Sequence, residues 1–162
     1  MYGKLSGVET SPIGTQPDVA GYEIRRVRTS AELEAAMALR YDVFCLEQGV
    51  PVSEERDGRD HLGLHLIAVD PENNVLGTCR LVFVGSTVQF SRLAVAQSVR
   101  RRGIATALLQ VADAETRAGG ADRLVLHAQT YARALYERAG YVPRGREFKE
   151  AGIEHVAMEK VL

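Results

Sequence analysis

The chain has 162 residues, of which 46% are hydrophobic and 25% charged, a composition that fits one domain able to bury a core. A formal net charge of −1 at pH 7 argues against a general nucleic-acid-binding surface. No apolar run reaches the ~18 residues that a membrane span requires, and two cysteines without metal-ligand spacing are typical of a reducing compartment. We therefore expect a cytoplasmic protein that binds neither nucleic acid nor a membrane. The sequence leaves open whether it forms a homodimer.

The first elements are predicted from composition and helix-capping spacing. Residues 1–20 are rich in Gly, Ser, Thr and Pro without hydrophobic periodicity, which predicts a flexible N-terminal arm before a single domain over residues 21–162. Tyr22–Val27 has the pattern of a short strand. Glu32 follows Thr29 at the spacing of a capping box, and apolar residues then continue at helical spacing for several turns.

A long loop and three strands are predicted next. Gln48–Gly63 contains Gly, Pro and many charged residues, so we expect a long loop that borders a substrate cleft. Leu64–Val69, Val75–Val84 and Thr87–Ala96 are rich in β-forming residues and are separated by short turn signals. These three runs predict an antiparallel meander.

The C-terminal half is predicted to alternate helices with strands. A helix begins at Ile104, has a buried face at helical spacing, and is ended by Gly119-Gly120. The later elements are a strand over Arg123–Ala128, a helix over Tyr131–Ala139, and a closing strand pair over Tyr141–Phe148 and Ile153–Val161. The resulting order of elements predicts a mixed α/β fold.

The segment Arg100–Ala105 leads into the helix that begins at Ile104 and carries three consecutive arginines and a glycine. The first turn of a helix has N–H groups without intrahelical acceptors and lies at the positive end of the helix dipole. Gly103 lets a phosphate approach the backbone, and the arginines add positive charge. A solvated charge run would explain the same residues, and both the P-loop and the dinucleotide fingerprints are absent. The prediction of a phosphorylated cofactor therefore needs support from a second, independent motif.

That second motif is present, and the two together resemble the GNAT superfamily of acyl-CoA-dependent N-acyltransferases over roughly residues 22–162. Arg100–Ala105, as Arg-x-x-Gly-x-Ala, is similar to the family's coenzyme A pyrophosphate loop. Ala132–Tyr141, as Ala-x-x-x-Tyr-x-x-x-Gly-Tyr, is similar to its later helix, whose tyrosine commonly faces the thioester sulfur. Gln129 stands where the family often has Asn, a departure at one side-chain contact. The resemblance implies the GNAT fold, an α/β fold with a mixed, mostly antiparallel sheet splayed between its fourth and fifth strands and flanked by helices.

The resemblance also implies acetyl-CoA as the acyl donor. Backbone N–H groups of Leu93–Val95 would pair with the pantetheine arm and polarise the acyl carbonyl. The residues expected to bind the coenzyme are Leu93, Ala94, Val95, Arg100, Arg101, Arg102, Gly103, Ile104, Ala105, Thr106, Gln129, Ala132 and Tyr136. No metal is expected, because His61 and His65 are four residues apart but His65 lies in a predicted strand, where the helical i,i+4 geometry is lost.

Finer motifs resemble the ElaA-like branch of the family. Val43–Pro51 reads Val-Phe-x-Leu-Glu-Gln-Gly-Val-Pro, and Asp57 and Asp60 follow it. Phe148–Met158 reads Phe-x-Glu-x-Gly-Ile-x-His-x-x-Met. That branch is itself poorly characterised, so the resemblance defines the fold more closely than the substrate.

Attack of an amine on a thioester needs a neutral amine and a proton for the departing thiolate. Tyr136 is the candidate proton donor, although a tyrosine packed in the core would fit its spacing equally well. Glu47, at the end of the first helix beside the presumed cleft, is a candidate base, as are His127 on a strand and His155 in the ElaA-like motif. Alternatively, Glu47 is a solvated carboxylate at a helix end, His127 is a buried histidine, and His155 is a hydrogen-bonded structural histidine. Arg92 either binds a substrate carboxylate or pairs with an acid across the sheet.

The favoured function is N-acetyl transfer from acetyl-CoA to a primary amine of a small molecule, by direct attack on the thioester. Two alternatives remain open. One is a module that binds acyl-CoA as a sensor without turnover, and the other is a protein-lysine acetyltransferase. Release of free thiol would separate the enzyme from the sensor.

Overall fold

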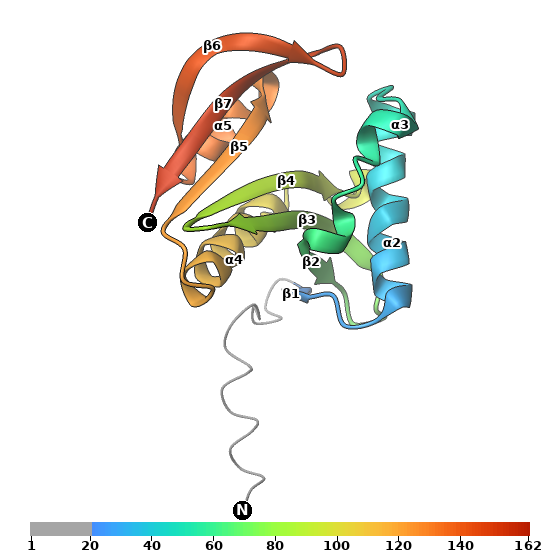
Figure 1. Ribbon diagram of the computed structural model, residues 1–162. Helices are drawn as coiled ribbons and strands as arrows, with labels where there is room; N and C mark the ends of the chain where they lie inside the picture. Colours follow the sequence, from blue (N-terminus) through green and yellow to red (C-terminus); the bar gives the residue numbers. More distant parts are fainter. Residues whose placement is uncertain (1–20) are drawn as a thin grey trace, which may run out of the picture.

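The computed structural model describes residues 21–162, so the arm predicted for residues 1–20 lies outside the described residues. One seven-stranded sheet has the order β1-β2-β3-β4-β5-β7-β6, and only β4 and β5 pair in parallel (Figure 1). The mixed, mostly antiparallel sheet and the meander β2-β3-β4 confirm the predicted fold class. The strands are β1 (Glu23–Arg26), β2 (Leu64–Val69), β3 (Val75–Val84), β4 (Thr87–Val95), β5 (Arg123–Gln129), β6 (Val142–Glu150) and β7 (Ile153–Val161).

The sheet opens between β4 and β5. Their parallel pairing covers only three residues of each strand and ends at Gln89 and Val125. Beyond this point β4 continues to Val95 and β5 to Gln129. Figure 1 shows the two strands side by side near the C-terminus and fanning apart away from it. The predicted splay between the fourth and fifth strands is therefore confirmed, and it leaves one edge of β4 without a strand partner.

A bulge in β4 lies where the two strands separate. Thr78 pairs with Ala94 but Arg80 pairs with Ser91, so β4 has one residue more than β3 in this stretch. Arg92 has a φ of 61°, in the left-handed region that is unfavourable for residues other than glycine. Bulges bend a strand and redirect its side chains. This bulge turns β4 away from β5 at the mouth of the opening.

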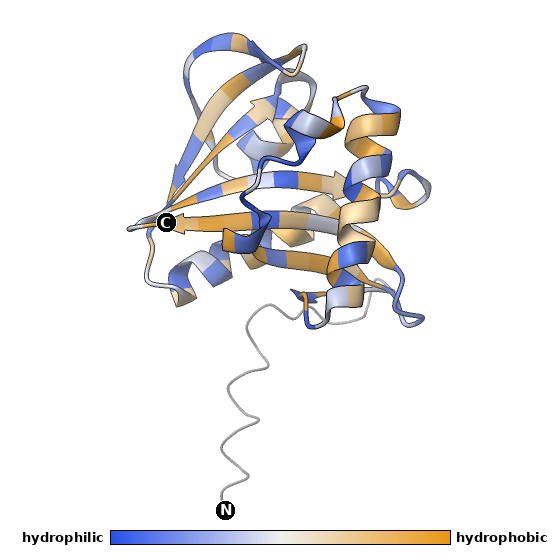
Figure 2. Cartoon of the chain, turned by 45° about the vertical axis from the view of Figure 1, so that its right-hand side comes forward, coloured by the Kyte–Doolittle hydropathy of each residue, from blue (hydrophilic) through white to orange (hydrophobic). Residues whose placement is uncertain are grey.

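Helices cover both faces of the sheet. α4 (Ile104–Ala118) and α5 (Arg133–Arg138) pack on one face, and α2 (Ser30–Arg40) packs against β3 and β4 on the other. Gly77 in β3 permits the close approach of α4, because a Cβ there would lie 2.8 Å from Cγ2 of Ile104. Figure 2 shows apolar residues dominating β2 and β3, whereas β6 is largely polar. Across residues 21–162, no helix combines the length and the hydropathy needed to cross a membrane.

The start of α2 follows the sequence prediction, but its continuation does not. The Thr29 side chain accepts a hydrogen bond from the Glu32 N–H at 3.1 Å, which confirms the predicted cap. After Arg40 the chain forms a π-helix over Tyr41–Glu47. This wider turn is rare and frequently lies at functional sites. The apolar spacing alone did not distinguish it from an α-helix.

Two predicted segments need correction. The loop predicted over Gln48–Gly63 contains the short helix α3 (Val52–Glu55) and a 3₁₀ turn at Asp60–Leu62. The helix predicted to begin at Tyr131 starts instead with a 3₁₀ turn, and α5 begins only at Arg133. Such single turns are too short to show hydrophobic periodicity, and tertiary contacts stabilise them.

Candidate active site

One cavity of about 1020 Å³ occupies the opening between β4 and β5. Arg100 and Ala105 line it beside the start of α4, and Tyr136 of α5 lines its centre. On the opposite face of the sheet it is lined by His127 of β5 and by Asp57. A cavity of this size is at the upper end of the range for small-molecule sites. The opening in the sheet is thus a passage with lining residues from both faces.

The start of α4 has the features of an anion site. Gly103 precedes the helix with a φ of 82°, and no side chain caps the helix start. The first helical hydrogen bond runs from the Ala107 N–H to the Gly103 carbonyl at 2.9 Å, so the N–H groups of residues 104–106 have no intrahelical acceptor. A Cβ built on Gly103 would meet no atom within 4 Å, so this surface is open. Free N–H groups beside open space fit a bound pyrophosphate.

The residues expected to bind the coenzyme divide into two groups. One group lines the cavity and consists of Leu93, Ala94, Val95, Arg100, Ala105, Gln129, Ala132 and Tyr136. The other group lies outside its lining and consists of Arg101, Arg102, Gly103, Ile104 and Thr106. The Ile104 side chain is 2% exposed and packs in the core. Only its backbone N–H could contact a ligand.

The structure moves Glu47 away from the predicted acceptor cleft. It lies outside the lining of the main cavity, and its two carboxylate oxygens each lie 2.7 Å from a terminal nitrogen of Arg100. The hydrogen bonds from Arg100 lower the pKa of the Glu47 carboxyl. A carboxylate paired with the arginine of the predicted coenzyme loop and made less basic is a poor general base. The structure therefore places Glu47 against Arg100 and outside the lining of the main cavity, an arrangement that does not favour the predicted base role, which stays a prediction.

A hydrogen-bonded chain crosses the mouth of the opening. Gln129 at the end of β5 donates to the Gln48 side chain at 2.8 Å. Gln48 in turn donates to the Tyr131 hydroxyl at 3.3 Å. Gln129 replaces the family's usual Asn, and its longer side chain reaches the segment that follows the π-helix. Neither Gln48 nor Tyr131 was predicted from the sequence, because nothing in the local pattern distinguishes them from ordinary surface residues.

Tyr136 is held in the core while it lines the cavity. Its ring packs edge-on against Phe90 and Tyr141, with centroid distances of 6.4 and 5.8 Å. Burial raises the pKa of the Tyr136 phenol above its ordinary value. The hydroxyl therefore stays protonated at physiological pH, as a proton donor to a thiolate must.

Six charged side chains form a closed ring beside the part of the cavity that Asp57 lines. Each arginine in this charge ring pairs with two carboxylates, and each carboxylate with two arginines, at distances of 2.7 to 3.2 Å. The arginine side chains that enter deepest, Arg40 and Arg80, are only 1% and 3% exposed. In order, the members of the charge ring are Arg40, Glu55, Arg92, Asp57, Arg80 and Asp60.

The charge ring decides the role of Arg92. Its guanidinium pairs with Glu55 and Asp57 and donates to the Glu55 backbone carbonyl at 2.9 Å. Of the two roles expected for Arg92, the structure shows the pairing with acids. The ring also connects the bulge in β4 to α3, so it fixes one wall of the cavity. The sequence did not reveal it, because its members are spread over more than fifty residues without a common spacing.

His127 and His155 both line the cavity, but they differ in exposure and in hydrogen bonding. His127 is half-exposed on β5, and its Nδ1 lies 2.8 Å from Oε1 of Glu150. His155 is buried, with Nδ1 at 2.7 Å from the Ile153 carbonyl oxygen and its ring stacked on Phe148. Among residues 21–162, no cluster of three or more His, Cys, Asp or Glu side chains could hold a metal ion.

The splayed sheet, the uncapped helix start and the cavity between them define a protein of the acyl-CoA N-acyltransferase class. A family model described as "Acetyltransferase (GNAT) domain" matches residues 34–162, and the chain belongs to the GNAT acetyltransferases. The family resemblance drawn from the sequence is confirmed.

Individual relatives agree with this assignment. The chain is 32% identical over 134 residues to the N-acetyltransferase YjcF of Bacillus subtilis, itself uncharacterized, a match that covers 82% of this chain and 95% of YjcF. The structure of an acyl-CoA N-acyltransferase from Pseudomonas aeruginosa is 28% identical with a TM-score of 0.75, covering 86% of this chain and 99% of that one. Escherichia coli ElaA has a TM-score of 0.77 at 21% identity over 86% of this chain and 99% of its own, a similarity of fold.

Replacing Gly103 tests the coenzyme loop. We expect Gly103→Asp to weaken binding of acetyl-CoA about tenfold or more, because it places a negative charge where the pyrophosphate would lie. Gly103→Asn is the matched control, since asparagine is nearly isosteric, uncharged and tolerant of a positive φ. Calorimetry should show a much smaller loss for the asparagine variant. Equal affinity in the aspartate variant and the wild type would contradict this assignment of the loop.

Glu47→Gln distinguishes a role of Glu47 as the ion-pair partner of Arg100 from its predicted role as the general base. Removal of the carboxylate leaves Arg100 unpaired and adds one positive charge beside the coenzyme loop. We expect acetyl-CoA to bind about two- to fivefold more tightly at low ionic strength, with the gain shrinking as salt screens the charge. The pH dependence of acceptor turnover should not change. A loss of turnover that is largest at neutral pH would restore Glu47 as the base.

Proposed function

We propose that this acetyltransferase transfers the acetyl group of acetyl-CoA to a primary amine of a small molecule, which attacks the thioester directly. The observation that carries the proposal is the continuous cavity from Arg100, past Tyr136, to the opposite face of the sheet. Two substrates that enter such a passage from opposite sides can meet inside it. Holding both reactants in position supplies a large part of the rate enhancement without a covalent enzyme intermediate.

The coenzyme side would bind acetyl-CoA through backbone groups and charge. The first turn of α4 and Arg100 would contact the pyrophosphate. The edge of Leu93–Val95 has no partner in β5, so it can pair with the amides of the pantetheine arm as an added strand would. A backbone N–H aimed at the acyl oxygen would stabilise the charge that develops there. Tyr136 would give its proton to the departing thiolate.

The acceptor side favours a small molecule over the lysine of a folded protein. Glu54, Asp57 and Arg59 line the cavity there, so the segment around α3 forms a wall of the site. The charge ring anchors this wall to β3 and β4. His155 would line the end of the acceptor pocket, where Phe148 and the Ile153 carbonyl fix its ring.

Thiol release with a panel of amines tests the proposed function. The panel contains small primary amines and lysine-containing peptides, each mixed with acetyl-CoA and the wild-type protein. We expect release of coenzyme A with at least one small amine and none above background with the peptides. Binding of acetyl-CoA without turnover of any amine would support the sensor module instead. Turnover of peptides alone would support a protein-lysine acetyltransferase.

A further inference from the structure

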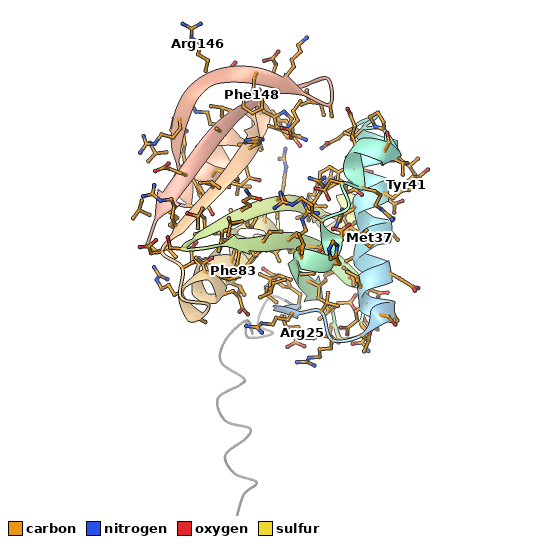
Figure 3. All side chains as sticks on the ribbon, in the orientation of Figure 1. Arg25, Met37, Tyr41, Phe83, Arg146 and Phe148 are labelled. Carbon is orange, nitrogen blue, oxygen red and sulfur yellow. The ribbon has the colours of Figure 1, made fainter. Side chains whose placement is uncertain are left out.

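A histidine and a glutamate pair on the acceptor wall of the cavity. His127 in β5 and Glu150 at the end of β6 both line the cavity, with 2.8 Å between Nδ1 and Oε1. The Phe148 ring meets the His127 ring edge-on, with 5.0 Å between the centroids. Figure 3 shows Phe148 on the inner side of β6, whereas Arg146 points away from the molecule. The pair therefore has an aromatic support on one side and the cavity on the other.

The strand register places His127 beside the point where β4 and β5 separate. Val125 is the last residue of β5 that pairs with β4, and His127 follows two positions later on the same face. Leu126 and Ala128 point to the other face, into the core that contains Tyr136. His127 and Tyr136 thus reach one cavity from opposite faces of the sheet.

This geometry suits an imidazole that accepts a proton. When Nδ1–H donates to Glu150, the lone pair lies on Nε2. Within the part of the chain that the structure describes, no protein group hydrogen-bonds to Nε2. A carboxylate on Nδ1 orients the ring and stabilises the imidazolium that forms. The need is large, because an alkylamine with a pKa of about 10.4 is neutral in only about one molecule in 2,500 at pH 7.

We propose that His127 is the general base of the acceptor site and that Glu150 is its positioning residue, an inference that rests on the proposed N-acetyltransferase function. Nε2 of His127 takes a proton from the ammonium form of the acceptor and passes it to solvent, so that the lone pair of the nitrogen can bond to the acyl carbon. As the tetrahedral adduct collapses, Nε2 takes a second proton from that nitrogen. The carbon–sulfur bond breaks, and the thiolate takes the proton of the Tyr136 hydroxyl. Both side chains then regain their starting protonation from solvent. His127 is preferred to His155 as the base, because the partner of His155 on Nδ1 is the neutral Ile153 carbonyl and its ring is buried, whereas His127 has a carboxylate partner and is half-exposed.

Other charges line the same region, and most of them are paired with each other. Glu159 of β7 pairs with Arg123 and Arg144. Asp57, across the cavity, belongs to the charge ring. The titratable or charged groups that face His127 are Glu150 and Arg144 from β6, His155 and Glu159 from β7, and Asp57 and Arg59 from the opposite wall. Of these, Glu150 alone has a hydrogen bond or ion pair with His127 among residues 21–162.

The pH dependence of turnover tests this assignment with any amine that the thiol-release panel identifies. We expect His127→Gln to lower kcat/KM for the amine about 100-fold at neutral pH and to remove the acid limb of the profile. The loss should shrink as the pH approaches the pKa of the amine. Glu150→Gln should lower kcat/KM about tenfold, because the His127 ring loses the carboxylate that orients it. The affinity of every variant for acetyl-CoA should stay within about twofold, which also verifies folding.

Glu147→Gln is the matched control, because it removes a carboxylate from the same strand outside the cavity lining. It should retain the wild-type profile, and His155→Gln should retain the acid limb. A pH-independent loss, or none, in His127→Gln would overturn the proposal. A second measurement needs no acceptor: the NMR signal of the Nδ1 proton of His127 should show a hydrogen bond to Glu150 in the wild type and should shift or disappear in Glu150→Gln. An unchanged signal would overturn the pairing even where the amine panel supports the proposed function.

Discussion

Tyr136→Phe is expected to lower kcat about 100-fold while leaving KM for acetyl-CoA nearly unchanged. The substitution removes the proton donor but keeps the ring that packs against Phe90 and Tyr141. Burial raises the pKa of Tyr136, so the wild-type phenol remains protonated up to and beyond its ordinary value of about 10. The ratio of wild-type to variant kcat should therefore stay constant between about pH 6 and 9. Steady-state kinetics over that range measures it.

Tyr141→Phe provides the matched control. Tyr141 is buried in the same aromatic cluster and lies outside the cavity lining, and its hydroxyl has no hydrogen-bond partner among residues 21–162. Removal of an unpaired buried hydroxyl is expected to be neutral or slightly stabilising. If both tyrosine variants lose activity to the same small extent, Tyr136 serves packing alone.

Arg40→Leu is expected to lower the free energy of unfolding by about 3–5 kcal/mol, the usual cost of removing one partner from a buried ion pair. Arg40 is the most buried member of the charge ring, and its loss leaves Glu55 and Asp60 each short of one cation. Urea unfolding measures the change. Arg40→Lys should fall between the wild type and the leucine variant, because a single ammonium cannot reproduce the forked contacts of guanidinium.

The exposed pair of Arg133 and Glu137 supplies the control for this experiment. Both side chains are about two-fifths exposed, at 40% and 44%, so Arg133→Leu should cost less than about 1 kcal/mol. Similar losses of unfolding free energy in Arg40→Leu and Arg133→Leu would show that the buried charge ring contributes no more to stability than an exposed ion pair. Should Arg40→Leu fail to fold, Asp60→Asn removes a less buried member and tests the same ring.

The charge ring also predicts how stability depends on pH. Hydrogen bonds from Arg80 hold the pKa of Asp57 well below its usual range. Burial alone would raise the pKa of Asp60, but hydrogen bonds from Arg40 and Arg80 outweigh it and leave that pKa lowered. Depressed carboxylate pKa values add stability above the ordinary aspartate value of about 3.9, and this stability is lost as the pH falls below it. Arg40→Leu should therefore lose less stability relative to the wild type in acid than at pH 7.

Local patterns in the sequence determined the proposed coenzyme side of this protein. Gly103 has a left-handed conformation directly before a helix with one buried face. Such a helix start can be predicted from a few neighbouring residues. The alternating runs of β2, β3 and β4 are local as well, because a strand shows its buried face every second residue. Together with the motif around Tyr136, they were sufficient to predict the fold and the family.

The tertiary structure alone decided the arrangement of the proposed acceptor side. The sequence placed Glu47 beside the acceptor cleft, whereas the π-helix turns it toward Arg100. His127 of β5 meets Glu150 of β6 only because β7 pairs with both of these strands. The charge ring likewise joins α2, α3, β3 and β4. Contacts between side chains far apart in the chain produce no periodic pattern in the sequence. The direction and partner of each charged group therefore depended on the packing of the whole sheet.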